Sequence, residues 1–407
     1  MVESVIQLKC LCNNYPWGKK GKESLAAQLC EKTPGTDFNI DENKDYAEMW
    51  MGTYPELPSY VLATGENLQH VIDKHAEELF GKTILNKFGH KDLPFLPKVL
   101  SIAKALPLQL HPNKELAAKL HARDPNNFTD PNHKPEIALA LGPFEAFCGF
   151  KPLVDIDRLL DLEPLRQFRP MVRKPAFDDQ SVKHVVKAML TASDEAIQSC
   201  GEQLQKIPKE NFGRDTYIPS MIERLWSQYD KTDPGTLVAL ITMNYMKLNK
   251  GDSIYIPADG IHAYLSGDII ECMARSNNVL NTGFCPSAER NNVNTFTDCL
   301  TFTPHSAEEA MLEPRKFARA KKGKTLEYAP PLSEFSVLGT ELGKGESETI
   351  GALGGPSILI ATSGNGKMKA KGMDYDLKEG YIFFIGYGVE MEFEAESGMQ
   401  IFTAFVE

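Results

Sequence analysis

The stretch GDSIYIPADGIHAYLSGDIIECM, residues 251–273, says most about how this chain folds. A glycine turn leads into a short apolar strand, a proline and then His262 at the start of the next strand-like run. A similar spacing returns near the C-terminus, where LKEG (377–380) stands in the place of LNKG (248–251). Counted from the last glycine of each, Met391 falls where His262 falls, eleven positions on. This echo predicts two related β-rolls of the jelly-roll type, and only the first has a histidine at this position.

Ligands for one divalent cation are spread along the same part of the chain. Gln109 and His111 lie two residues apart on a strand-like run, so both side chains face one side. Glu136 and His262 complete a set of two imidazoles, one carboxylate and one amide carbonyl. A sulfur-free set suits a catalytic zinc, which keeps room for water or substrate. Manganese and iron are also compatible with imidazole and carboxylate ligands.

Two further histidines compete for a place in this set. His121 falls on an expected helix beyond the Gln109 strand, where a solvent-facing position is favoured. His133 and Glu136 are three residues apart, so on an extended chain they face opposite ways. We therefore keep Glu136 as the ligand from this segment.

Composition limits the class of protein and its partners. At 407 residues the chain is long enough for two or three domains. A net charge of −11 argues against nucleic acid or an anionic membrane as the main partner, whereas a phosphorylated small molecule needs only a few local cations. The eight cysteines are scattered without a C-x-x-C pair, which is typical of reduced thiols. Since there is no signal-like N-terminus and no membrane-length apolar run, we expect a cytoplasmic protein, and we expect a monomer.

The segment order predicts a mainly β protein with inserted helices, made of two jelly-roll domains and a helical domain. We expect residues 1–154 and 236–312 to form the metal-binding jelly roll, 155–235 the inserted helical domain, and 313–407 a jelly roll without a metal site. Strands are expected over residues 5–11, 46–53, 95–102, 106–110, 137–141, 145–149, 236–245, 253–256 and 268–273. Helices are expected over residues 22–31, 68–80, 114–123, 156–162, 182–191, 193–205 and 217–229.

Residues 251–273 resemble the cupin pattern, and with the ligand set the chain closely resembles one family, the type I phosphomannose isomerases. Six motifs occur in the family's order between about residues 15 and 284. They are YPWG (15–18), AEMWMGT (47–53), PFLPKVLS (94–101), QLHPNK (109–114), NHKPE (132–136) and HAYLSGDIIE (262–271). Each motif is short, but six in order are a strong signal.

The resemblance implies one zinc ion held by Gln109, His111, Glu136 and His262. It also implies reversible interconversion of D-mannose 6-phosphate and D-fructose 6-phosphate, which supplies mannose for GDP-mannose and glycosylation. The family opens the sugar ring and transfers a proton between C1 and C2 through a cis-enediol(ate). That reaction needs an electrophile for the developing oxyanion and a base that shuttles one proton.

Several residues are candidates for this chemistry. Glu271, nine residues after His262, is the first candidate for the acid/base, and Lys134 is the second, as proton donor or as a cation that stabilises the enediolate. Tyr264 is a candidate for orienting a hydroxyl group. The residues that match positions lining the family's pocket are Trp17, Glu48 and Lys98.

The chain departs from the family pattern where the phosphate is expected to bind. Asn281 stands where the family has an arginine, and Ser287 stands where it has a lysine. Pro107 and Tyr54 replace a family serine and histidine. Arg290, three residues past Ser287, is the candidate replacement, because a guanidinium suits bidentate contact with phosphate.

Two other classes of function stay open at this point. A metal-dependent bicupin oxygenase would use two histidines and a glutamate with open positions for oxygen, although Gln109 and Lys134 argue against it. A non-catalytic or sugar-sensing bicupin is suggested by the missing arginine and lysine.

Overall fold

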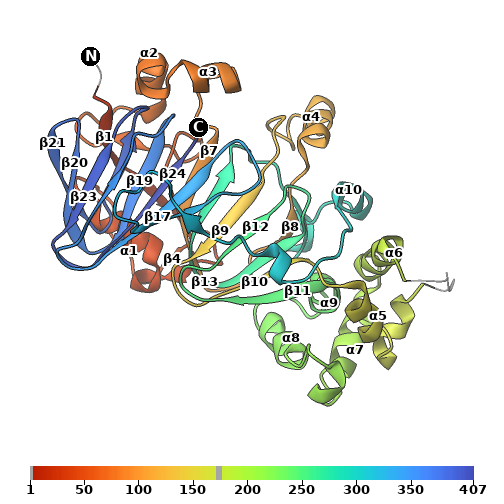
Figure 1. The fold of residues 1–407 in the computed structure, drawn as a ribbon. Coiled ribbons are helices and arrows are strands. Elements are labelled where there is room, and N and C mark those ends of the chain that lie inside the picture. The colour runs from red at the N-terminus through yellow and green to blue at the C-terminus, as the bar shows by residue number, and fades with distance from the viewer. Residues whose placement is uncertain (1–2, 171–176) are drawn as a thin grey trace.

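The computed structural model describes residues 3–170 and 177–407. Its strands form a ten-stranded, an eight-stranded and a four-stranded sheet, with a short two-stranded ribbon. Figure 1 shows two β regions lying next to each other, one mainly green and yellow and one mainly blue. A group of helices lies at the end of the green region that faces away from the blue one. The predicted fold class, mainly β with inserted helices, is confirmed.

The first roll is built around one long strand, β13 (His262–Ala274). Its second half pairs on one edge with β7 (Phe95–Ile102) and on the other with β9 (Glu136–Ala140). Its first residue pairs with β8 (Leu108–Leu110), and β12 (Ser253–Ile256) pairs with β9. Segments far apart in the sequence are thereby joined at the start of β13, and this is where the predicted ligands meet.

The second roll repeats this local geometry. Gly251 and Gly380 both have a positive φ, 90° and 86°, which a glycine adopts without strain. β12 and β22 (Ile382–Ile385) each begin two residues after that glycine, and β13 and β23 (Met391–Ala395) each begin eleven residues after it. The spacing seen in the sequence is thus a repeated turn–strand–turn–strand unit.

The N-terminal strand differs from the predicted division, which assigned residues 1–154 to the metal-binding roll. β1 (Val5–Lys9) pairs with β22, and β6 (Tyr60–Val61) pairs with the other edge of β1. Both strands therefore belong to the eight-stranded sheet of the second roll. Strand pairing across almost the whole chain leaves no local signal in the sequence, so the prediction followed chain order instead.

The predicted strand over residues 236–245 is wrong in its first part. Residues Gly235–Thr242 form a helix, α9, and the strand β11 (Met243–Leu248) begins only afterwards. Every residue of α9 is buried, and α9 packs against α6 (Asp179–Leu190). A short, continuous apolar run has no periodicity that separates a buried helix from a buried strand. The domain boundary that the sequence predicted between residues 235 and 236 therefore falls in the first turn of α9. This helix packs against other helices of the helical region.

Other elements follow the sequence closely. The expected helices over residues 68–80 and 114–123 are α2 (Leu68–Phe80) and α4 (Lys114–Arg123), each capped by an asparagine side chain that accepts a hydrogen bond from a backbone N–H of the first turn. The helical region contains α5 (Leu153–Leu159), α6, α7 (Asp194–Leu204), α8 (Ile218–Trp226) and α9. No helix in the described residues is long and apolar enough to cross a membrane.

Candidate active site

Three buried ligand-type side chains meet at one end of the first roll. His111 follows β8, Glu136 begins β9 and His262 begins β13, and none is more than 1% exposed. Their potential ligand atoms all lie within 4.8 Å of one another. Nε2 of His111 is 3.3 Å from Oε1 of Glu136, and Nε2 of His262 is 3.5 Å from Oε2. The fold thus brings together three of the four predicted metal ligands.

Hydrogen bonds on the far side of each ring fix which nitrogen faces the cluster. Nδ1 of His111 lies 2.7 Å from the carbonyl oxygen of Asn278, and Nδ1 of His262 lies 3.0 Å from that of Gly260. Because a carbonyl only accepts, each Nδ1 carries the proton and each Nε2 offers a lone pair. Both Nε2 atoms are buried and lack a hydrogen-bond partner within the described residues. Burial, and then the charge of Lys134, lowers the pKa of His111 to about 4, which keeps this ring neutral.

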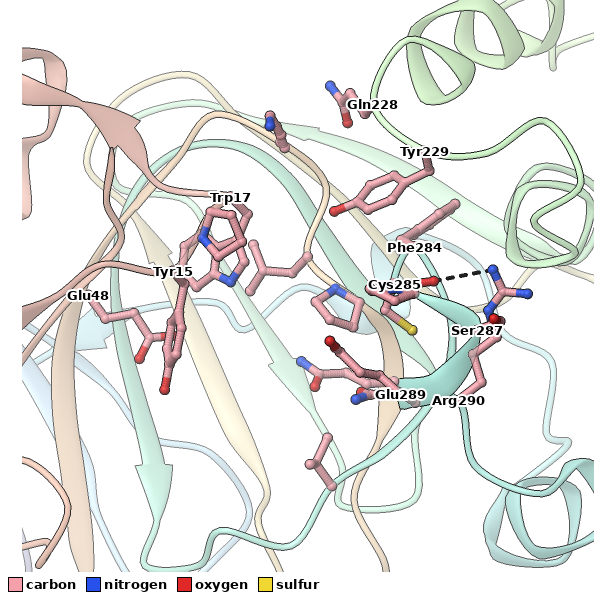
Figure 2. A pocket seen from close by; sticks show the side chains of 18 of the residues that line it. Tyr15, Trp17, Glu48, Gln228, Tyr229, Phe284, Cys285, Ser287, Glu289 and Arg290 are labelled. Atoms are coloured by element: carbon pink, nitrogen blue, oxygen red, sulfur yellow. Dashed lines mark hydrogen bonds between the residues drawn. The ribbon is translucent and has the colours of Figure 1, made fainter. Parts of the chain in front are cut away.

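A cavity of about 1200 Å³ opens beside this cluster. Among the predicted site residues, those on its wall are Trp17, Glu48, Lys98, Gln109, Lys134, Glu136, Glu271 and Arg290. In Figure 2 the side chains of Trp17 and Glu48 lie on one side, and Ser287 and Arg290 lie across from them. The cavity is large enough for a sugar phosphate and is lined by both charged and aromatic groups.

Gln109 lies beside the histidine–glutamate cluster. Its Cα is in register with that of His262 on one neighbouring strand, and with that of Asn281 in β14 (Leu280–Gly283) on the other. Its side chain is partly buried and lines the cavity. The amide oxygen is therefore a candidate for a fourth ligand.

Glu136 is kept ionised by its neighbours. Burial opposes ionisation, but the charge of Lys134, whose Nζ is 3.2 Å from Oε1, outweighs it, so the pKa of Glu136 lies well below its usual range. The hydroxyl of Tyr264 donates to Oε2 at 3.4 Å. The sequence made Tyr264 a candidate for orienting a hydroxyl, but its side chain is 1% exposed and absent from the cavity wall. Its hydroxyl contacts Glu136 and not the cavity.

A second charged cluster lies on the same wall, where β7 and β13 pair. Lys98 and Glu271 are opposite one another in register, and Nζ of Lys98 is 3.0 Å from Oε2 of Glu271 and 3.7 Å from Oε2 of Glu48. Burial disfavours the charged form of Lys98, but these carboxylates more than compensate and raise its pKa. Burial also raises the pKa of Glu271, and the charge of Lys98 only partly offsets that. A buried carboxyl with a raised pKa is suited to taking up and releasing a proton.

Arg290 reaches the cavity but is partly committed to the protein. Its Nη2 donates to Oδ2 of Asp233 at 3.0 Å and to the carbonyl oxygen of Cys285 at 3.2 Å. Asp233 is fully buried, so this ion pair fixes the guanidinium against the wall. Asn281 and Ser287 line the cavity as well and are both uncharged.

The competing histidines lie outside the cluster. His133 binds Glu334 of the C-terminal region, with 2.7 Å between Nε2 and Oε1, and this contact helps lower the pKa of Glu334 to about 2 against the opposing effect of burial. Nδ1 of His121, at the end of α4, lies 2.6 Å from the carbonyl oxygen of Phe128.

Sequence reasoning missed the part of the wall that the helical region supplies. Gln228, Tyr229 and Thr232 follow α8 and line the cavity. Nothing in the residues themselves marks them, because they lie in a loop whose position depends on how the helices pack on the roll. Asn278, which holds His111 through its backbone, was missed because a carbonyl carries no sequence signal.

Two family models match the chain. The model of the phosphomannose isomerase type I catalytic domain matches residues 5–153, and the phosphomannose isomerase type I C-terminal model matches residues 328–372.

Similar proteins were found both by sequence and by structure. The mannose-6-phosphate isomerase of Aspergillus fumigatus is 38% identical over 443 residues, covering 98% of this chain and 95% of the relative. That of Saccharomyces cerevisiae is 38% identical over 435 residues, covering all of both chains. The mannose 6-phosphate isomerase of Salmonella typhimurium, solved bound to its substrate and a zinc atom, superposes with a TM-score of 0.82 at 26% identity and full coverage of both chains.

Proposed function

The chain belongs to the type I phosphomannose isomerase family, and we propose that it interconverts D-mannose 6-phosphate and D-fructose 6-phosphate with one zinc ion per chain. The observation that carries the proposal is the buried cluster of His111, Glu136 and His262 at a large cavity, with Glu271 on the same wall. The relatives named mannose-6-phosphate isomerase cover nearly the whole chain, which supports the same activity here.

The metal would be held by His111, Glu136 and His262, with Gln109 as the fourth ligand. The two orphaned imidazole lone pairs and the ionised carboxylate fit zinc, which prefers such a nitrogen and oxygen set. When bound, zinc supplies a Lewis acid that stabilises negative charge on the sugar oxygens. Tyr264 supports the site by donating to Glu136.

Glu271 is proposed as the base that carries the proton between the two carbons. It takes the proton from C2 of the open-chain aldose, which gives the cis-enediol(ate), and returns it to C1. The hydroxyl proton of O2 passes to O1 in the same conversion, so C2 becomes the ketone carbonyl and C1 carries a hydroxyl group. Lys98 orients Glu271 through the 3.0 Å ion pair. Lys134, on the cavity wall beside Glu136, is proposed as the cation or proton donor for the enediolate oxygens.

Trp17 and Glu48 are proposed to contact the sugar. Trp17 is 9% exposed, and only the part that lines the cavity is open to a ligand. Glu48 accepts a hydrogen bond from the indole of Trp50, which fixes its carboxylate on the wall. Arg290, the phosphate contact expected from the sequence, lines the opposite side of the cavity, where Asp233 holds its Nη2 and its Nε is buried without a partner among the described residues. We propose that it supports this wall and that the phosphate is held elsewhere.

We further propose that the protein is a monomer in a reducing compartment such as the cytoplasm. All eight cysteines are free thiols, and seven of them are buried. Among the described residues, the exposed large apolar side chains come from five separate segments of the chain: Leu11 and Tyr15, Val154, Leu326, Met373 and Tyr387. Light scattering on the purified protein tests the oligomeric state.

A coupled assay of fructose 6-phosphate formation, on protein of measured metal content, tests the main proposal. Zinc-dependent turnover is expected. Zinc-replete protein without turnover would favour a sugar-binding bicupin, a possibility that the uncharged Asn281 and Ser287 motivate. Bound iron with oxygen uptake would favour an oxygenase.

A further inference from the structure

Four cationic side chains of the described residues line the cavity, and three of them are already paired. Lys98, Lys134 and Arg290 each have a nitrogen within 3.0–3.2 Å of a carboxylate oxygen. The fourth, Lys104, is exposed, and its ammonium has no acidic partner within residues 3–170 and 177–407. It is the cation in this set that an anionic ligand can use without breaking an ion pair.

The backbone around Lys104 is fixed on two sides. The N–H groups of Ala103 and Lys104 both donate to the carbonyl oxygen of Trp17, at 2.9 and 3.2 Å. On the other side, the N–H of Ala105 donates to Oε1 of Gln228 at 3.0 Å, and the hydroxyl of Tyr229 donates to the carbonyl oxygen of Ala105. The loop over residues 103–107 is therefore clamped between the first roll and the helical region, while the lysine side chain stays free.

The hydrogen bond to Ala105 also settles the orientation of the Gln228 amide. A backbone N–H can only donate, so the amide oxygen must face it and the NH₂ group must face away. Nε2 of Gln228 has no hydrogen-bond partner in the described part of the chain, and the side chain lines the cavity. Figure 2 shows Gln228 at the rim, next to Tyr229. The rim therefore carries two free N–H donors beside a clamped lysine loop.

We propose that Lys104 and the amide of Gln228 form the binding site for the phosphate group of the substrate. A phosphate dianion is bound best by a cation combined with neutral N–H donors. The chain has Asn281 and Ser287 where its family has cations, and Asp194, Asp230 and Glu289 add negative charge to the cavity wall. The phosphate therefore needs a cation that is not neutralised, and Lys104 supplies it. This inference rests on the proposed function, which sets a sugar phosphate as the ligand.

The first test replaces the charge of Lys104. In zinc-loaded protein, Lys104→Met should raise the KM for mannose 6-phosphate, and the Kd for orthophosphate measured by calorimetry, by about tenfold or more while kcat changes little. Lys104→Arg should stay within a few-fold of wild type. Lys231→Met is the matched control, because Lys231 is exposed on the same region and lies over Trp226 away from the cavity wall.

The second test uses the fixed amide. Gln228→Glu keeps an oxygen acceptor for the N–H of Ala105 but replaces the NH₂ group with a negative charge, so the fold is retained and phosphate is repelled. The KM and the Kd for orthophosphate should rise at least as much as in Lys104→Met. Unchanged constants in both variants would overturn the inference, and so would a loss of phosphate binding in Arg290→Ala alone.

The two readouts separate this inference from the proposed function. Orthophosphate binding needs no turnover, so a wild-type protein without isomerase activity that loses phosphate affinity in Lys104→Met would refute the isomerase but support the phosphate site. An active wild type whose KM ignores both substitutions would refute the phosphate site alone. A wild type that neither turns over nor binds orthophosphate would refute both.

Discussion

The two β-rolls share a turn and a strand spacing but differ at one buried position. His262 and Met391 both lie eleven residues after a glycine with positive φ, both begin a strand, and both are 0% exposed. His262 faces Glu136, whereas Met391 pairs in register with Ile350 inside an apolar cluster. The same backbone position therefore carries a proposed metal ligand in one roll and a packing residue in the other.

This difference shows that the fold sets where the side chain points, whereas the residue at that position sets the chemistry. The repeated unit aims the first side chain of the strand into the interior, whichever residue stands there. In the first roll that interior holds two imidazole lone pairs and a carboxylate, which are costly to bury without a cation. In the second roll a methionine fills the space and needs no ligand. On our proposal, function thus depends on three side chains from separate segments, and the second roll is expected to contribute stability.

The largest expected effect comes from His262→Ala. Removing this imidazole should abolish stoichiometric zinc and reduce turnover by at least about a thousandfold, because the metal carries the oxyanion charge. Metal analysis and the coupled assay on the same preparation measure both. Retention of one zinc per chain would refute the ligand assignment. It would also remove the functional contrast between the two rolls.

That contrast could be drawn from the sequence only in part. The echo between residues 251–262 and 380–391 was visible because turns and strand starts leave local signals, and the expected strands over residues 95–102 and 253–256 match the structure. Helix α9 was taken for a strand because a fully buried apolar run has no periodicity. β1 was assigned to the first roll because the residues of its partner β22 are 374–380 positions away in the sequence.

The same limit, that contacts between distant segments leave no local signal in the sequence, applies to the site. Motifs near the strands named the three residues of the cluster, and they named Lys98 and Glu271 separately as pocket and acid/base candidates. The ion pair between Lys98 and Glu271 follows from strand register in the structure. The motifs did not identify Lys104 and Gln228, because the loop that carries Lys104 is joined to Gln228, through Ala105, only where the helical region packs on the roll. Tyr264 was identified, but its place behind Glu136 follows from the packing of a buried tyrosine.

Glu271→Gln should have the next largest effect. Zinc should stay bound, while kcat falls by about a hundredfold to ten-thousandfold because the proton carrier is lost. In the wild type, burial raises the pKa of Glu271 above its ordinary value of 4.5. A base must be ionised, so kcat/KM should rise with pH through that raised pKa. The residual activity of the variant should lack this acid limb, and a persistent limb with near-normal turnover would exclude Glu271 as the base.

Tyr264→Phe should have a smaller effect, of about tenfold on zinc affinity. The phenol touches Glu136 and not the cavity, so its loss loosens one ligand without removing it. A competition titration with a chelator measures the affinity, and kcat at saturating zinc should stay close to wild type. A large loss of kcat in the zinc-saturated variant would instead indicate that the hydroxyl acts on the substrate.

Met391→Ala should have the smallest effect on activity and completes the comparison with His262→Ala. The substitution leaves a cavity beside Ile350, so the free energy of unfolding should fall by about 2–5 kcal/mol, measured by urea denaturation. Zinc content and kcat of the folded protein should be unchanged, because the second roll offers no ligand to the site. Loss of zinc in this variant would mean that the second roll supports the metal site directly, and the division between a metal-binding and a packing roll would then be untenable.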